Sequence, residues 1–258
     1  MRSVAIVFLS LHNAFATHSR RLPDYDTIML NGTQHFFNIL IERRAALFFI
    51  DALRLDWREL ALACKTSAAT RRIPICLVSD DVEIRADAIT NGADLALSWA
   101  ELDIQLDALV MELARLPDEA TTAQLACECE GALPPLAVEG LALFNRGEYY
   151  RQHDLFEEQW MATTGPVRDL YRAVLQVGVA YYQIERGNYR GALKMLQRSV
   201  QWLYLLPDSC QGIDVAKLRR DSYAVRSELQ RLGPDRLDEL DHNLIKKIAW
   251  QAPQSSST

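Results

Sequence analysis

The stretch YYRQHDLFEEQW, residues 149–160, brings together residue types that can do chemistry. Glu157 follows His153 by four residues and Trp160 follows it by seven. On a helix, these spacings place the three side chains on one face, whereas Glu158 points elsewhere. An imidazole beside a carboxylate can ligate a metal, act as an acid–base pair, or join two helices through buried hydrogen bonds. The stretch is therefore a candidate site with three competing interpretations.

A metal site needs more ligands than this helix supplies. A catalytic zinc ion is usually held by three protein ligands and a water molecule. His153 and Glu157 provide two, and the sequence offers no obvious third ligand. We therefore assert no metal site and expect no cofactor, and we keep His153 and Glu157 as candidate ligands only.

The other two interpretations recruit residues from neighbouring helices. In a ligand pocket, His153 and Glu157 would bind or transform a small molecule that Gln176 and Asn188 orient. In the structural interpretation, His153 is buried, and Glu157 and Gln176 are its hydrogen-bond partners. Trp160 would then pack between helices. No nucleophile motif, phosphate-binding loop or cofactor fingerprint accompanies these residues, so we favour the structural interpretation and assert no catalytic residue.

Apolar residues at helical spacing predict an all-helical second half after Pro134-Pro135. In the segment ERGNYRGA, Gly187 can end one helix in the left-handed conformation and Asn188 can cap the next. Gly191 would allow the two helices to approach closely. The predicted helices span residues 136–146, 149–161, 167–186, 189–205, 215–232 and 237–250.

In the first half, short apolar runs alternate with amphipathic segments. Runs separated by helices rather than by tight turns indicate βαβ units and a parallel sheet. The predicted fold class is α/β plus all-α: a five-stranded, doubly wound parallel sheet followed by a compact helical bundle. The predicted strands span residues 4–9, 27–30, 46–50, 75–78 and 95–97, and the predicted helices span residues 13–21, 34–43, 56–70, 82–91 and 103–116.

The apolar run from Val4 to Leu11 has a second interpretation. With Arg2 before it and Ala14 and Ala16 after it, the run has the outline of a short secretory signal. We favour the strand because the following segments need it to complete the sheet. Whether the run is ever processed as a signal stays open.

Three strand ends in the first half carry a recognisable set of residues. Asp51 ends the third strand in LFFIDAL, Ser79 follows the fourth in ICLVSDD, and NGADLALSW leads out of the fifth. Residues 4–116 thereby resemble the receiver domain of response regulators. The resemblance implies that Asp51 stands at the phosphoacceptor position and Ser79 where that family carries Ser or Thr.

Two features of an active receiver are missing from the sequence. A receiver needs an acidic pair after the first strand to hold Mg²⁺, and here that place is Ser10-Leu11-His12. The lysine expected after the fifth strand is replaced by Trp99. Asp51 is therefore a degenerate phosphoacceptor position. We expect a pseudo-receiver that is not phosphorylated and serves as a scaffold or dimerisation domain.

Three motifs follow one another along the helical half: LFNRGEYYRQHDLFEEQW, VLQVGVAYYQIERGNYRGA and QGIDVAKL. In this order, over about residues 136–232, they resemble the family called domain of unknown function 309. That family is a compact helical domain with an H-x-x-x-E-E-x-W signature. It often has a histidine on its third helix, where this chain has Gln183. The departure removes one ligand from any metal site that uses both histidines.

The bulk composition narrows the function classes. The 258-residue chain is 49% hydrophobic and 24% charged, which is typical of a globular protein. A net charge of −6 and a pI near 5.4 argue against a broad nucleic-acid surface. After the N-terminal run, no apolar stretch is long enough to span a membrane. Five cysteines, an odd number without framework spacing, indicate a reducing compartment with Cys127 and Cys129 as free thiols.

Together these features predict a pseudo-receiver over residues 1–117, a linker with at most one helical turn over 118–135, a helical domain over 136–250 and a disordered tail over 251–258. We expect a cytoplasmic, non-enzymatic regulatory or adaptor protein whose helical domain binds a protein or a small ligand. The expected partner is another protein or a second copy of the chain, not nucleic acid or a membrane. The alternative is a small-molecule or metal-dependent enzyme that uses His153 and Glu157.

Overall fold

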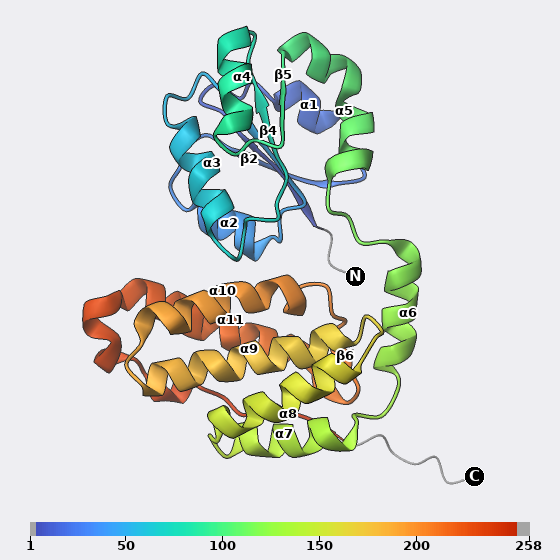
Figure 1. The fold of residues 1–258 in the computed structure, drawn as a ribbon, viewed down its shortest axis with the longest axis vertical. Coiled ribbons are helices and arrows are strands. Elements are labelled where there is room, and N and C mark those ends of the chain that lie inside the picture. Colours follow the sequence, from blue (N-terminus) through green and yellow to red (C-terminus); the bar gives the residue numbers. More distant parts are fainter. Residues whose placement is uncertain (1–3, 252–258) are drawn as a thin grey trace. The chain divides into compact units, whose positions relative to one another are not determined.

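The computed structural model describes residues 4–251 (Figure 1). The chain forms two compact units that join between Leu116 and Pro117, and each is described by itself. Arg2 of the signal-like segment and residues 252–258 of the expected disordered tail lie outside the described residues. Among residues 4–251, no helix is both long and apolar enough to cross a lipid bilayer.

The N-terminal unit is built on a five-stranded parallel sheet. Its strands are β1 (Ala5–Leu9), β2 (Asp26–Leu30), β3 (Leu47–Asp51), β4 (Ile75–Val78) and β5 (Leu95–Leu97), in the order β2-β1-β3-β4-β5. The sequence predicts all five to within one residue at each end. Strands β1, β3 and β4 are buried along their whole length, which is why each is a continuous apolar run rather than an alternating one.

Helices cover both faces of this sheet. Helices α2 (Phe36–Glu42), α3 (Trp57–Thr66) and α4 (Val82–Thr90) pack on one face, and α1 (Ala16–Arg20) and α5 (Trp99–Leu113) pack on the other (Figure 1). Neighbouring strand residues point into different hydrophobic clusters: Val7 and Phe48 into the first, Phe8 and Phe49 into the second. The carboxyl ends of the strands therefore meet at one edge of a sheet that is held on both faces.

One boundary difference bears on that edge. The sequence predicts a helix from Asp103, but α5 begins at Trp99 because Ser98 and Glu101 form a capping box. Glu101 N donates a hydrogen bond to Ser98 Oγ at 3.2 Å, and Ser98 N donates one to Glu101 Oε2 at 2.7 Å. Trp99 thus lies in the first turn of a helix, close to the end of β5.

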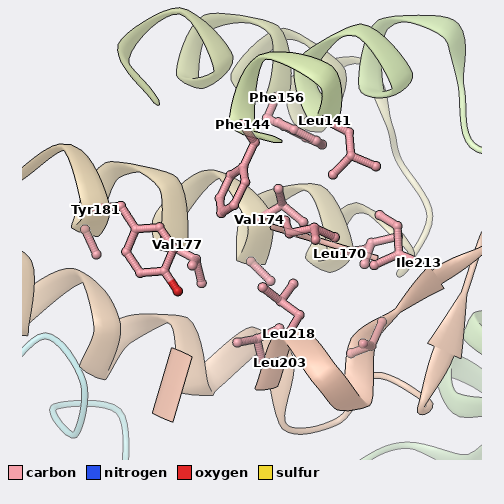
Figure 2. Packing of buried hydrophobic residues seen from close by; sticks show 14 of the residues in the cluster. Leu141, Phe144, Phe156, Leu170, Val174, Val177, Tyr181, Leu203, Ile213 and Leu218 are labelled. Carbon is pink, nitrogen blue, oxygen red and sulfur yellow. The ribbon is translucent and has the colours of Figure 1, made fainter. Parts of the chain in front are cut away.

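The C-terminal unit is helical apart from a short hairpin. Its helices are α6 (Glu119–Cys129), α7 (Pro135–Asn145), α8 (Tyr149–Ala162), α9 (Arg168–Glu185), α10 (Tyr189–Leu203) and α11 (Val215–Leu232), and the hairpin pairs β6 (Ser209–Cys210) with β7 (Ile213–Asp214). The sequence predicts α7 to α11 to within two residues. Helix α9 packs against both α8 and α10, and its Leu170, Val174, Val177 and Tyr181 point into the core (Figure 2).

The predicted linker is in large part a helix attached to the C-terminal unit. Helix α6 has about three turns, where at most one was predicted. Its last residue, Cys129, is disulfide-bonded to Cys210 in β6, 81 residues later. The prediction that Cys129 is a free thiol is therefore wrong, because spacing along the chain gave no indication of so distant a partner. The other three cysteines, Cys64, Cys76 and Cys127, are free.

Hydrogen bonds reinforce this attachment. Glu128 Oε2 accepts a hydrogen bond from Val167 N at 2.9 Å, just before the first turn of α9. Gln211 N donates to Cys129 O at 2.7 Å, and Tyr171 Oη donates to Gln211 Oε1 at 2.7 Å. A carboxylate at a helix N-terminus also interacts favourably with the helix dipole. The end of α6 is therefore fixed to α9 and to the hairpin loop.

The predicted helix over residues 237–250 is wrong. Residue Gly233 has a φ of +74° and is followed by a proline, so α11 ends there. Ile248 N donates to Asn145 Oδ1 at 2.8 Å, and Asn145 Nδ2 donates to Ile248 O at 3.0 Å. The backbone thus pairs with α7 rather than with itself. The regular structure here consists of two short 3₁₀ helices, η1 (Pro234–Glu239) and η2 (His242–Leu244).

Candidate functional site

Helix α8 has a buried stripe with the predicted site residues beside it. Its fully buried positions are Tyr149, Gln152 and Phe156. His153, Glu157 and Trp160 are half-buried, and Glu158 is exposed. The spacing argument therefore placed three of the side chains correctly on one side of the helix. It did not place them in the core.

His153 has a different partner from the one predicted. Its Nδ1 lies 3.1 Å from Asp154 Oδ1 on the next residue, and its side chain is 35% exposed. The predicted burial of His153 and its pairing with Glu157 and Gln176 are wrong, because a neighbouring carboxylate is in reach at the surface. Among residues 4–251, no group of three His, Cys, Asp or Glu side chains is arranged to hold a metal ion.

Trp160 packs against two arginines of α9. The guanidinium carbons of Arg168 and Arg172 lie 5.2 and 4.7 Å from the centre of its ring. Arg172 also lies 3.9 Å from the ring centre of Trp202 on α10, so this cation is held between two indoles. Trp202 Nε1 in turn donates a hydrogen bond to Gln176 Oε1 at 3.2 Å. The predicted residues Trp160 and Gln176 are thus joined through two residues that the sequence analysis did not single out.

Asn188 has the helix-capping role that the sequence predicts. Its Oδ1 accepts a hydrogen bond from Gly191 N at 3.0 Å and caps α10. Its Nδ2 donates to Gln183 Oε1 at 2.7 Å. A Cβ on Gly191 would lie 2.6 Å from Asn188 Nδ2, so the glycine is needed for this close packing. Gln183, which stands where the resembling family often has histidine, is therefore part of the joint between α9 and α10.

The most deeply buried polar side chain of α8 is Gln152, which was not predicted. It is 0% exposed, and neither its Nε2 nor its Oε1 has a hydrogen-bond partner. A Cβ on Gly178 of α9 would lie 2.3 Å from Gln152 Nε2. The amide therefore packs directly on the backbone of α9. A sequence signal exists only in retrospect, since Gln152 falls on the same helical stripe as Tyr149 and Phe156.

The second candidate site lies at the carboxyl edge of the sheet, around Asp51. This residue is 1% exposed; Leu53 N donates to its Oδ1 at 3.0 Å, and its Oδ2 has no hydrogen-bond partner. Burial raises the pKa of Asp51, and the hydrogen bond from Leu53 N and the charges of His12 and Arg54 partly oppose that rise. A hollow of about 340 Å³ adjoins it, lined by Asp51, Ala52, Leu53, Val78, Ser79, Asp80, Asp81, Ile84 and Trp99.

The groups around the hollow close loops and cap helices. Trp99 N donates to Asp80 Oδ1 at 3.1 Å, and Glu83 N donates to Asp81 Oδ1 at 2.8 Å at the start of α4. After β1, Ala14 N donates to Ser10 Oγ at 3.0 Å.

The side chain of Trp99 occupies the space beyond β5. Its ring lies 4.9 Å from the ring of Phe15 and 5.8 Å from that of His18, centre to centre. An aromatic cluster therefore stands where the receiver resemblance would place a lysine.

The match to a known family lies in the helical unit. Residues 137–195 match the family model described as Domain of unknown function (DUF309). The predicted resemblance is confirmed over this range, which contains the H-x-x-x-E-E-x-W signature. An "Uncharacterized protein" of Aquifex aeolicus (strain VF5) is 24% identical over 85 residues, or 33% of this chain. The matched part is 26% of that relative, so the similarity concerns a minor part of each protein.

Proposed function

We propose that the chain is a non-enzymatic regulatory or adaptor protein, in which a receiver-like unit without phosphoryl-transfer chemistry is joined to a helical unit that binds a protein or a small ligand. One observation carries the proposal: the environment of Asp51. The parallel strand order β2-β1-β3-β4-β5 with helices on both faces supports a doubly wound fold, and Asp51 ends the central strand of the sheet. In such folds, ligands bind at this edge.

Phosphoryl transfer needs a metal and a cation beside the acceptor to neutralise the developing charge. At the edge of this sheet, Asp80 and Asp81 already accept backbone hydrogen bonds, and Trp99 packs on Phe15 rather than presenting a charge. Asp51 itself is buried. These contacts support a receiver-like unit that works through association rather than phosphorylation.

The test is incubation of the full chain with acetyl phosphate and Mg²⁺, followed by intact-mass spectrometry. We expect no stoichiometric gain of a phosphoryl group, and Asp51→Asn serves as the blank for phosphate at other residues. A gain that is present in the wild type and absent in Asp51→Asn would overturn this part of the proposal.

In the helical unit, the support for a binding role is a face formed by Trp160, Arg172 and Trp202. These half-buried side chains come from three successive helices, α8, α9 and α10. Indole and guanidinium groups are the types most enriched at positions that dominate binding energy in protein interfaces. Purification of the intact chain with one stable partner would support the role. A partner-free protein that turns over a metabolite would contradict it.

The alternative is an enzyme of the helical unit, and one observation favours it: the imidazole of His153 is partly exposed and lies one turn from Glu157. The discriminating experiment measures metal content and thermal melting for the wild type and His153→Ala. Because His153 is partly exposed and its polar partner is the exposed carboxylate of Asp154, we expect its loss to change stability by less than about 0.5 kcal/mol. Stoichiometric metal that disappears in the variant would favour the enzyme.

Cytoplasmic localisation stays a prediction. Its main support was a set of cysteines interpreted as free, and the Cys129–Cys210 disulfide removes that support for one pair.

A further inference from the structure

The hollow beside Asp51 is an unusual place for an unpartnered charge. Burying a carboxylate oxygen without a hydrogen bond is costly unless a partner arrives. Asp51 Oδ2 has no partner among the described residues, although the side chain is 1% exposed and lines a hollow of about 340 Å³. Burial also raises the pKa of this carboxyl group. The wall of the hollow therefore contains a buried acceptor that still lacks a donor.

The charges around the hollow are unbalanced towards negative. Asp80 and Asp81 line it together with Asp51. Two nearby cations donate to other groups: Arg54 from Nε and Nη2 to Asp56 at 3.0 and 2.8 Å, and Arg85 from Nη1 to Ser79 O at 2.7 Å. The charges of Arg54 and His12 act on Asp51 through space, but neither side chain forms a hydrogen bond with Asp51 Oδ2. The hollow is thus suited to a positively charged group.

The surroundings of the hollow are apolar and exposed. Leu53 lines it and is 68% exposed, Leu55 follows at 96%, and Val82, next to Asp81, is 68% exposed. Leu55 and Val82 stand within two residues of the hollow's lining along the chain, and exposed apolar groups beside a polar hollow suit a contact with another protein. We call Leu53, Leu55 and Val82 the apolar rim. A small cation would occupy the hollow and leave this rim uncovered, so the occupant needs apolar groups next to its charge.

We propose that this edge binds a segment of a partner protein that inserts one lysine or arginine side chain into the hollow and lays flanking apolar residues on the apolar rim. The inserted cation donates to Asp51 Oδ2 and supplies the positive charge that Trp99 does not. The inference rests on the proposed regulatory role of this unit and names the chemistry of its partner. A charge-assisted hydrogen bond in a hollow, surrounded by apolar contacts, is the arrangement that dominates many interfaces.

The experiment selects binders from a random peptide library displayed on phage, with the full-length chain as bait. We expect enriched peptides with a single lysine or arginine between apolar residues. For a synthetic copy of the best peptide, calorimetry should give a Kd at least about tenfold weaker on Asp51→Asn. Leu55→Ser should weaken binding several-fold.

Two matched substitutions control for charge and for exposed apolar area. Asp107→Asn removes an exposed carboxylate on α5, and Ile104→Ser removes an 82% exposed side chain from the same helix. Both should keep the wild-type Kd to within about twofold. Replacement of the peptide's arginine by citrulline, which is neutral and similar in shape, should reproduce the effect of Asp51→Asn.

Other outcomes would overturn the proposal. These are the absence of a basic apolar consensus, equal binding to Asp51→Asn, equally tight binding of arginine amide alone, or self-association of the chain that depends on Asp51 and Leu55. The last result would make a second copy the occupant. None of these peptide-binding results depends on phosphorylation, so the outcome of the acetyl phosphate experiment does not decide the outcome of the binding experiment.

Discussion

Each unit of the chain has a buried side chain with unpartnered polar atoms: Asp51, at its Oδ2, and Gln152, at both its Nε2 and its Oε1. Their surroundings differ. Asp51 adjoins a hollow, whereas Gln152 is packed so closely on α9 that a methyl group at Gly178 would lie 2.3 Å from its Nε2.

The space beside Asp51, which Gln152 lacks, decides whether a buried unpartnered group indicates a binding site. A group with space beside it can receive a ligand, and the missing hydrogen bond then contributes to affinity. A group enclosed by backbone has no such route, and its cost is borne by the fold. We therefore assign a binding role to Asp51 and a packing role to Gln152. The predictions below test this division, beginning with the change of largest effect.

Asp51 and Gln152 lie in different units, so their contributions to stability can be compared only if the two units melt in separate transitions. Replacing both Cys129 and Cys210 by serine removes a link across 81 residues of the helical unit, and we expect a loss of about 2–5 kcal/mol for that unit. Calorimetry should show one transition shifted down and the other unchanged. Cys127→Ser, at an exposed free thiol, is the control and should shift neither transition. A shift of both would mean that the units do not melt independently.

Gly178→Ala tests the enclosure of Gln152. Alanine normally stabilises a helix relative to glycine by about 1 kcal/mol, but here the added Cβ would meet Gln152 Nε2 at 2.3 Å and Cδ at 2.7 Å. We expect a net loss of about 1–3 kcal/mol in the free energy of unfolding of the helical unit. In the double variant with Gln152→Ala, most of this loss should disappear. Additive losses would show that Gln152 has room to move, and the contrast with Asp51 would fail.

Sequence reasoning identified the strands because the buried ones are continuous apolar runs, and it identified α7 to α11 by their periodicity. It missed the start of α5 because the Ser98–Glu101 capping box was not recognised. It missed the disulfide and predicted a helix over residues 237–250 that does not form. Both features depend on contacts between segments that are distant along the chain. Local patterns carry no information about such partners.

For the candidate sites, too, spacing along the chain predicted some features, and contacts between distant segments determined the rest. The spacing of His153, Glu157 and Trp160 correctly gave a shared side of α8. It did not reveal that Arg172 would stand between Trp160 and Trp202, although arginines at residues 168 and 172, four apart, were a signal that could have been used. The hollow at Asp51 is formed where several strands end, so the receiver resemblance could name Asp51, Ser79 and Trp99 at this edge but could not predict the space between them.

Asp51→Asn has the smallest expected effect on stability of these substitutions, and it tests the binding role assigned to Asp51. Burial raises the pKa of Asp51 in the folded chain above its ordinary value of 3.8. The folded state therefore holds the proton more tightly than the unfolded state. The stability that Asp51 contributes is present below pH 3.8 and is lost as the pH rises through the folded pKa. An asparagine avoids this loss, so the N-terminal unit of the variant should be more stable at pH 7 by about 1 kcal/mol.

The measurement is the melting temperature of the N-terminal transition in the two proteins from pH 7 down towards pH 4. We expect the advantage of Asp51→Asn to shrink as the pH falls, because protonation gives the wild type the same neutral side chain. Asp107→Asn, at an exposed carboxylate paired with Arg21, should show no comparable advantage at pH 7. The selected peptide should reverse the order at pH 7, since it binds the charged wild type at least about tenfold more tightly and stabilises it by mass action. An asparagine variant that is both less stable and still able to bind the peptide would show that Asp51 supports the fold and not the partner.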